Sequence, residues 1–431
     1  MQMATHALHD LPACDETSSV SRGRSIGCMP ARAIRIPAIS ALMVVACAAA
    51  HAGDMRAEFA RWEAEADAAL GNKPKQAAGE KRQPPVAPKE KTCPVCGGSG
   101  KYPCPTHQKQ IAFWIEGQPA PACCGGLGWI PCPRCPRDQQ QANAEAYRQA
   151  LEAEKTLMAE LGKFKEQSGL RLTVTLTPRM AFISDLNPRS CVASAQQCED
   201  LLRKMEKIFG CDKFAFTTAE DTRFFIFQRR EGYLAFLDKV YKEMFPDADL
   251  YLCKKAMGFH HCQEPSMSFG DYSMMRSQSG MDHHVVHTYA HFLLSRLGGF
   301  KRLPVWQEEG FAAWCETLQL RQPETYCFAY EAKDVDIGSN RKRFLQEGIR
   351  KNRLCQLPTL DRLSLDGYEL AHYFMSWSIV NMLIDRSPEN FVTFIEAQKG
   401  GDSTEEALIK AYDYNWPKLY EVWKRYVLAG H

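Results

Sequence analysis

The stretch 283-HHVVHTYAHFLLSRLGG-299 constrains this 431-residue chain more than any other. His283, His287 and His291 recur every four residues, so on an α-helix all three lie along one face. Two histidines with this spacing can supply two ligands to one zinc ion. A single buried histidine would need no functional explanation, whereas three in register indicate a metal site. We expect the third ligand to come from a neighbouring helix.

A candidate for that third ligand follows in 304-PVWQEEGFAAWCE-316. Together the two stretches resemble the gluzincin zinc metallopeptidases, the peptidase MA-like group, whose pattern is HExxH followed by P-x-W-L-x-E-G-x-A. The resemblance implies that His287, His291 and Glu309 are the zinc ligands. It covers residues 169–431 and implies an α+β domain with a small sheet followed by a mainly helical half.

One position departs from the family pattern, because Thr288 stands where the family has a glutamate. That glutamate takes a proton from zinc-bound water and passes it to the leaving amine. Threonine has neither a suitable pKa nor the reach for this role. Tyr373, or alternatively Tyr368, would supply the donor that stabilises the transition state. The resemblance therefore implies a zinc-binding protein that is a weak or inactive peptidase and binds a protein or peptide.

Two alternatives remain open for the large domain. It is an active metallopeptidase if another group replaces the missing base, and the candidates are Glu308, His283 and His284. It is a scaffold held by zinc and disulfides if the large domain holds no metal. The three candidate ligands together argue against the scaffold, and Thr288 argues against full activity.

Cysteines are concentrated in a second region, where seven of the 18 lie between Cys93 and Cys135. Two segments there share the pattern C-G-G-x-G-x-x-P-C-P. A zinc knuckle needs two ligands about three residues apart, so that one tight turn directs both at the ion. Three pairs have this spacing: Cys93/Cys96, Cys104/His107 and Cys132/Cys135.

This cysteine module resembles the cysteine-rich zinc region of DnaJ-type co-chaperones, although it has no J-domain motif. In that family the first and fourth knuckles share one zinc and the middle two share another. The resemblance implies one site from Cys93, Cys96, Cys132 and Cys135, and a second, less regular site from Cys104, His107, Cys123 and Cys124. A disulfide cluster is the alternative, since oxidising compartments favour disulfides.

The amino-terminal region predicts export. From Met29, two arginines precede an apolar run over residues 39–50, and small residues follow at the two positions that a signal peptidase reads. The pattern predicts a signal peptide over residues 29–52, with residues 1–28 as a misassigned extension. In the alternative interpretation, Cys47 ends a weak lipoprotein box. The run is too short and alanine-rich for a membrane span.

Strands are expected at 171–177 and 224–228, and helices at 196–209 and 231–245. Strands begin this region and helices dominate later, which also indicates an α+β class. The formal net charge of +2 gives no argument for a nucleic-acid partner. The predicted organisation is a targeting segment (1–52), a short helix and linker (53–92), the cysteine module (93–136), a helical connector (137–168) and the gluzincin-like domain (169–431).

Overall fold

The computed structural model describes residues 55–72, 93–96, 99–107, 110–210, 218–325, 327 and 337–431. These residues belong to one compact unit that spans residues 53–431. The expected targeting segment with Cys47, and most of the linker before the cysteine module, lie outside the described residues. None of the described helices combines the length and the apolar character that a membrane-spanning helix needs.

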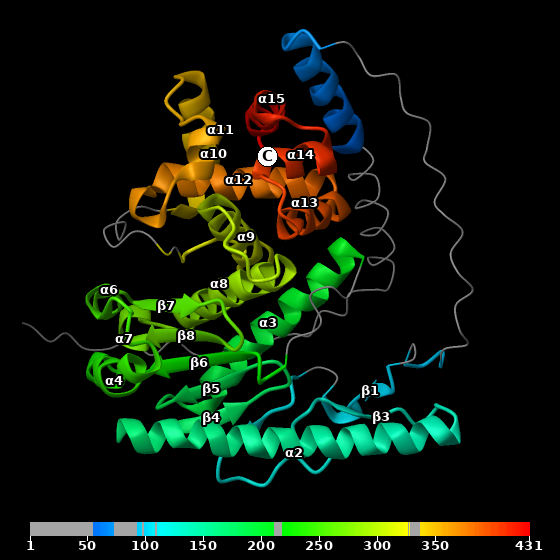
Figure 1. Ribbon diagram of the computed structural model, residues 1–431, viewed down its shortest axis with the longest axis vertical. Coiled ribbons are helices and arrows are strands. Elements are labelled where there is room, and N and C mark those ends of the chain that lie inside the picture. Colours follow the sequence, from blue (N-terminus) through cyan, green and yellow to red (C-terminus); the bar gives the residue numbers. More distant parts are fainter. Residues whose placement is uncertain are drawn as a thin grey trace, which may run out of the picture. The chain divides into compact units, whose positions relative to one another are not determined.

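A six-stranded sheet with the order β2-β4-β5-β6-β8-β7 precedes the helical half (Figure 1). The central strands β5, β6 and β8 are parallel, and the other pairs are antiparallel. Every residue of β5 and β6 is buried. The strands are Trp114–Ile115 (β2), Thr173–Leu176 (β4), Ala181–Ser184 (β5), Thr222–Phe227 (β6), Gly258–His261 (β7) and Ser266–Asp271 (β8).

Helices cover both faces of this sheet. Alternate residues of a strand point to opposite faces, so Phe224 and Ile226 pack in the core that includes α3 and α8. Phe225 and Phe227 pack in the other core, with α2 and α4. The helices of this half are Arg137–Ser168 (α2), Pro188–Phe209 (α3), Arg230–Phe236 (α4), Lys242–Met244 (α5), Leu250–Lys255 (α6) and Tyr272–Met275 (α7), with a π-helical turn at Leu237–Tyr241.

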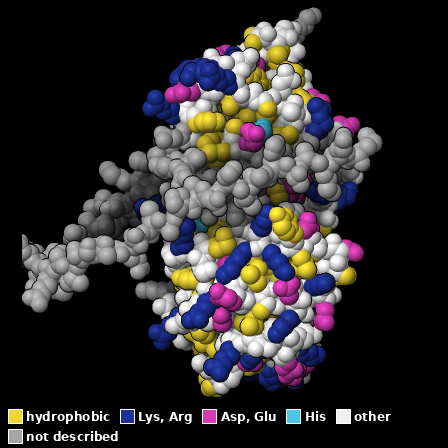
Figure 2. Space-filling model, turned by 90° about the vertical axis from the view of Figure 1, so that its left-hand side faces the viewer, with side chains coloured by type: hydrophobic (Ala, Val, Ile, Leu, Met, Phe, Trp, Pro, Cys, Tyr) yellow, Lys and Arg dark blue, Asp and Glu magenta, His cyan; other side chains and the backbone are white. Residues whose placement is uncertain are grey.

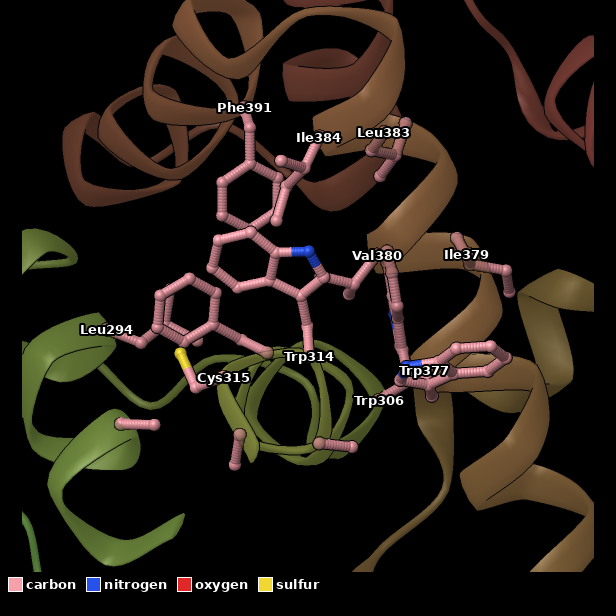
Figure 3. Packing of buried hydrophobic residues seen from close by; sticks show 14 of the residues in the cluster. Leu294, Trp306, Trp314, Cys315, Trp377, Ile379, Val380, Leu383, Ile384 and Phe391 are labelled. Carbon is pink, nitrogen blue, oxygen red and sulfur yellow. The ribbon is translucent and has the colours of Figure 1, made fainter. Parts of the chain in front are cut away.

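The second half is helical and is built around α9, which packs against α8 and α12. Side chains from α9, α12 and α13 meet in one apolar core, among them Trp314, Val380 and Phe391 (Figure 3). The helices are Gln278–Leu297 (α8), Val305–Leu320 (α9), Ile337–Arg350 (α10), Leu357–Arg362 (α11), Leu370–Arg386 (α12), Pro388–Gly400 (α13), Thr404–Tyr412 (α14) and Trp416–Leu428 (α15).

A separate helix over residues 55–69 docks on the carboxyl-terminal helices. Phe59 stacks on Tyr426 with 5.9 Å between ring centroids. The Glu63 carboxylate accepts a hydrogen bond from Arg386 Nε at 2.6 Å. Apolar burial and ion pairing together therefore fix this helix to the helical half.

The expected α+β class is confirmed, and β4 and β6 lie where alternating or apolar stretches predicted strands. The periodicity did not predict β5, β7 or β8. β5 and β7 have only four residues each, and the periodicity of such short stretches is ambiguous.

Candidate metal centres

The helix α8 is unusual because it carries polar side chains through the interior. It lies between the sheet and α9 (Figure 1), and every residue from His283 to Ser295 is buried. Ser277 starts the helix by accepting a hydrogen bond from the Gly280 N–H group. Buried imidazoles are costly unless they find partners, so the contacts of these histidines define what the site can do.

Three predicted residues converge on one point. The Nε2 atoms of His287 and His291 lie 3.0 Å apart. The Glu309 carboxylate on α9 lies 3.7 Å from His287 Nε2 and 3.4 Å from His291 Nε2. His260 of β7 stacks on the His291 ring with 4.4 Å between centroids. The structure thus brings together the residues matched to the gluzincin pattern, while their role as ligands stays a prediction.

Glu316 orients one of these histidines, although the sequence analysis did not single it out. Its carboxylate accepts hydrogen bonds from His287 Nδ1 at 2.7 Å and from His283 Nδ1 at 2.6 Å. Burial alone would raise the pKa of Glu316, but these hydrogen bonds and charges hold it below its ordinary value. With Nδ1 of His287 donating, its Nε2 lone pair faces His291 and Glu309.

Glu316 could have been found from the sequence. It follows Glu309 by seven residues, which is two helical turns, so the two carboxylates share one face of α9. Glu316 also accepts from His283 Nδ1, and His283 Nε2 lies 3.6 Å from the Glu324 carboxylate, so both ring nitrogens of His283 face carboxylates. A carboxylate behind a ligand histidine is a common arrangement in metal sites.

Cys327 is a further group at this point, and the sequence did not point to it. Its Sγ atom lies 3.5 Å from His287 Nε2 and 3.7 Å from His291 Nε2. Its backbone N–H donates to the Glu309 carboxylate at 3.4 Å. The four donor atoms of His287, His291, Glu309 and Cys327 all lie within 4.8 Å of one another.

These separations fit one metal ion. Zinc bonds of about 2.0–2.1 Å to nitrogen and oxygen and about 2.3 Å to sulfur imply tetrahedral donor separations of roughly 3.3–3.7 Å. The observed distances between donor atoms, from 3.0 to 3.7 Å, include that range. Nitrogen, oxygen and sulfur donors together suit zinc.

The Thr288 side chain is hydrogen-bonded within its own helix. Its hydroxyl donates back to the His284 carbonyl oxygen of the same helix at 2.8 Å. His284 itself faces Ser268 at 3.1 Å, and burial lowers its pKa to about 3. Burial and the neighbouring Glu309 raise the pKa of Glu308 to about 7.

Tyr373, the expected transition-state donor, is engaged elsewhere. Its hydroxyl donates to the Thr325 carbonyl oxygen at 2.9 Å. Tyr368, the alternative, pairs with the Ser376 hydroxyl. The structure therefore gives both tyrosines hydrogen-bonding roles within the helical half, and their catalytic role stays a prediction.

The cysteine module is built on a reciprocal pair of hydrogen bonds between its two repeats. The Cys104 N–H group donates to the Gly128 carbonyl oxygen at 2.9 Å, and Cys132 N–H donates to Gly100 at 2.8 Å. Both glycines have positive φ, 71° and 73°, which other residues adopt only with strain. The strands Lys101–Pro103 (β1) and Trp129–Pro131 (β3) pair antiparallel between these contacts.

Two clusters of possible ligands result. In the first, the Sγ atoms of Cys93 and Cys132 lie 3.9 Å apart, and those of Cys96 and Cys135 lie 3.5 Å apart. All four lie within 4.8 Å of one another. Disulfide sulfurs would lie about 2.05 Å apart, and none of the described cysteines forms a disulfide. The distances match thiolates that share a metal.

The second cluster is less regular, as expected. The Nδ1 atom of His107 lies 3.4 Å from Cys124 Sγ and 3.7 Å from Cys123 Sγ. Burial would raise the pKa of Cys104, but the hydrogen bond from His107 and other contacts lower it to about 6. Burial instead raises the pKa of Cys124 to about 11. The donor atoms of Cys104, His107, Cys123 and Cys124 all lie within 4.8 Å of one another, so the cluster can hold a second ion once its thiols are deprotonated.

No protein-family model matches this chain, and no curated protein matches its sequence. The geometry of these three clusters is therefore the basis for assigning a function to this protein.

Proposed function

We propose that this protein is an exported zinc protein whose large domain keeps a gluzincin-like ligand set, lacks peptidase chemistry, and binds a protein or peptide. Two features of α8 and α9 support this proposal together. His287, His291 and Glu309 converge as metal donors, while Thr288, in the position of the base, is bonded to its own helix. The chain thus has residues to hold zinc and lacks the expected residue to move a proton.

The missing proton transfer is the reason to expect loss of hydrolysis. A bound zinc supplies Lewis-acid chemistry and acidifies water. The departing amine of a peptide still needs a proton, and a positioned base contributes ~10²–10⁴ in rate. Both ring nitrogens of His283 face carboxylates, and burial lowers the pKa of His284 to about 3, which makes it a poor base. Neither histidine therefore replaces the glutamate that the gluzincin pattern requires.

The cysteine module supports a second, structural role for zinc. Its four knuckles are grouped in the way that the DnaJ-type resemblance implies. The first and fourth form one cluster, and the middle two form the other. On the face drawn in Figure 2, basic and acidic side chains are interspersed, which fits a mixed protein-binding surface better than a basic nucleic-acid site.

The test is peptide hydrolysis by the full chain, purified with zinc, against an unbiased peptide mixture. We expect no cleavage above that of His291→Ala, which removes one ligand. His372→Ala is the matched control, because His372 caps α12 through the Glu369 N–H group. Chelator-sensitive cleavage that is lost in His291→Ala and kept in His372→Ala would contradict the proposal, and would direct attention to Glu308 as the base.

A further inference from the structure

Cys327, in the segment that follows α9, faces the two candidate ligand histidines. Its sulfur is nearly equidistant from the Nε2 atoms of His287 and His291, at 3.5 and 3.7 Å. Its N–H group also contacts the Glu309 carboxylate. A thiol at metal-sharing distances from both histidines, and within 4.8 Å of a Glu309 carboxylate oxygen, occupies the place of a fourth donor.

The chain before Cys327 is fixed in place by the same residue that orients His287. The Glu316 carboxylate accepts from the Glu324 N–H group at 2.9 Å and from the Thr325 N–H group at 3.2 Å. The Tyr373 hydroxyl holds the Thr325 carbonyl oxygen from the other side. Three hydrogen bonds therefore set the position of the backbone two residues before the thiol.

We propose that Cys327 is the fourth protein ligand of the large-domain metal, so that His287, His291, Glu309 and Cys327 form a closed site. The proposal rests on the proposed function, because it requires that the first three residues hold the ion. Catalytic zinc sites have three protein ligands and an open position for water, whereas structural sites have four. The large domain would then differ from a peptidase in two respects, the absent base and the filled water position.

A closed site has a consequence for ligand binding. A peptide can reach the metal only if its own carboxylate, thiolate or carbonyl oxygen displaces the Cys327 sulfur. Binding that leaves the thiolate in place must use the protein surface instead. The metal would therefore hold α8, α9 and the segment after α9 together.

The test uses the reactivity of the thiol, because Cys327 is exposed and a metal-bound thiolate is shielded from alkylation. The full-length, zinc-loaded protein is treated with iodoacetamide, and each cysteine is quantified by peptide mass spectrometry. We expect Cys327 to react roughly tenfold faster in His291→Ala than in the wild type, because loss of the metal frees the sulfur. Cys355, a half-buried free thiol outside the three clusters, is the internal control and should react equally in both.

A second measurement guards against a folding defect in His291→Ala. In cobalt-substituted protein, Cys327→Ser should lose part of the thiolate-to-cobalt charge-transfer absorption, whereas Cys355→Ser should lose none. The thiolates of the cysteine module contribute equally to both variants. Absorption that is equal in the two variants would overturn the proposal.

The outcomes separate the two proposals. If Cys327 reacts equally fast in the wild type and His291→Ala while His291→Ala still loses one zinc, the three-ligand site stands and the fourth ligand is wrong. If His291→Ala loses no zinc, both proposals fail. If zinc is lost and Cys327 becomes reactive only in the variant, both are supported.

Discussion

The cysteine module and the large domain hold candidate metal sites in opposite ways. The buried clusters of the module consist mostly of the ligand thiols, with Tyr102, Ala112 and Ile130 as the few additional apolar residues. The donors of the large domain are on helices of 20 and 16 residues that pack in an extensive apolar core. We therefore expect the module to need bound metal in order to fold. The large domain would fold without metal, and its apolar core would position the ligands.

Removal of metal should separate the two regions most strongly. Structural zinc supplies apparent binding free energies of about 10–16 kcal/mol in small zinc modules, which have little other source of stability. We therefore expect a strong chelator to unfold β1, β3 and the cysteine knuckles that they join, while β2, which belongs to the six-stranded sheet, stays folded together with α8 and α9. Hydrogen exchange read by mass spectrometry measures this directly. Equal loss of protection in α8 would show that the large domain also depends on its metal for folding.

Close packing of α9 should set the stability of the large domain. A Cβ atom on Gly310, next to Glu309, would lie 2.6 Å from the Ser376 carbonyl oxygen of α12. We expect Gly310→Ala to lower the free energy of unfolding by about 1–3 kcal/mol through overpacking. Denaturant unfolding measures the change.

Gly400→Ala is the matched control for this substitution, because nothing lies within 4 Å of its Cβ position. It should change stability by less than ~0.5 kcal/mol. Equal effects of the two alanines would mean that the close approach of α12 to α9 at Gly310 does not limit the stability of the large domain.

Loss of the Glu316 charge should weaken the large-domain site without affecting the module. Replacement of groups that orient a metal ligand lowers metal affinity by about 10–100-fold, and we expect Glu316→Gln to fall in that range. Competition with a chromophoric chelator measures the affinity. Glu347→Gln, whose exposed carboxylate pairs with Arg343 and Lys351, should leave the affinity unchanged, and a similar drop in both variants would argue against the role of Glu316.

Restoring the base should have the smallest effect. Thr288→Glu completes the HExxH pattern, but Cys327 still lies at the two histidines. We expect detectable chelator-sensitive peptide cleavage only when Thr288→Glu is combined with Cys327→Ser. Substantial cleavage by Thr288→Glu alone would show that the site is open to water.

The sequence predicted those parts of the molecule that follow from local spacing. The four-residue interval of His287 and His291 and the three-residue interval of the knuckles state which side chains share a turn. Cys327 could not be predicted in this way, because its approach depends on the contacts of Glu316 and Tyr373 with the segment before it. These are tertiary contacts, and the number of residues between α9 and Cys327 does not predict them.

The zinc content of the full chain is the most direct test of the proposal that each of the three clusters binds one zinc ion. The described residues contain three clusters that can hold a metal ion, so we expect three zinc ions per chain by elemental analysis. His291→Ala should contain two, and so should Cys93→Ser combined with Cys132→Ser, because each variant removes ligands from a different cluster. A wild-type chain with two zinc ions, unchanged by His291→Ala, would contradict the account of the large domain.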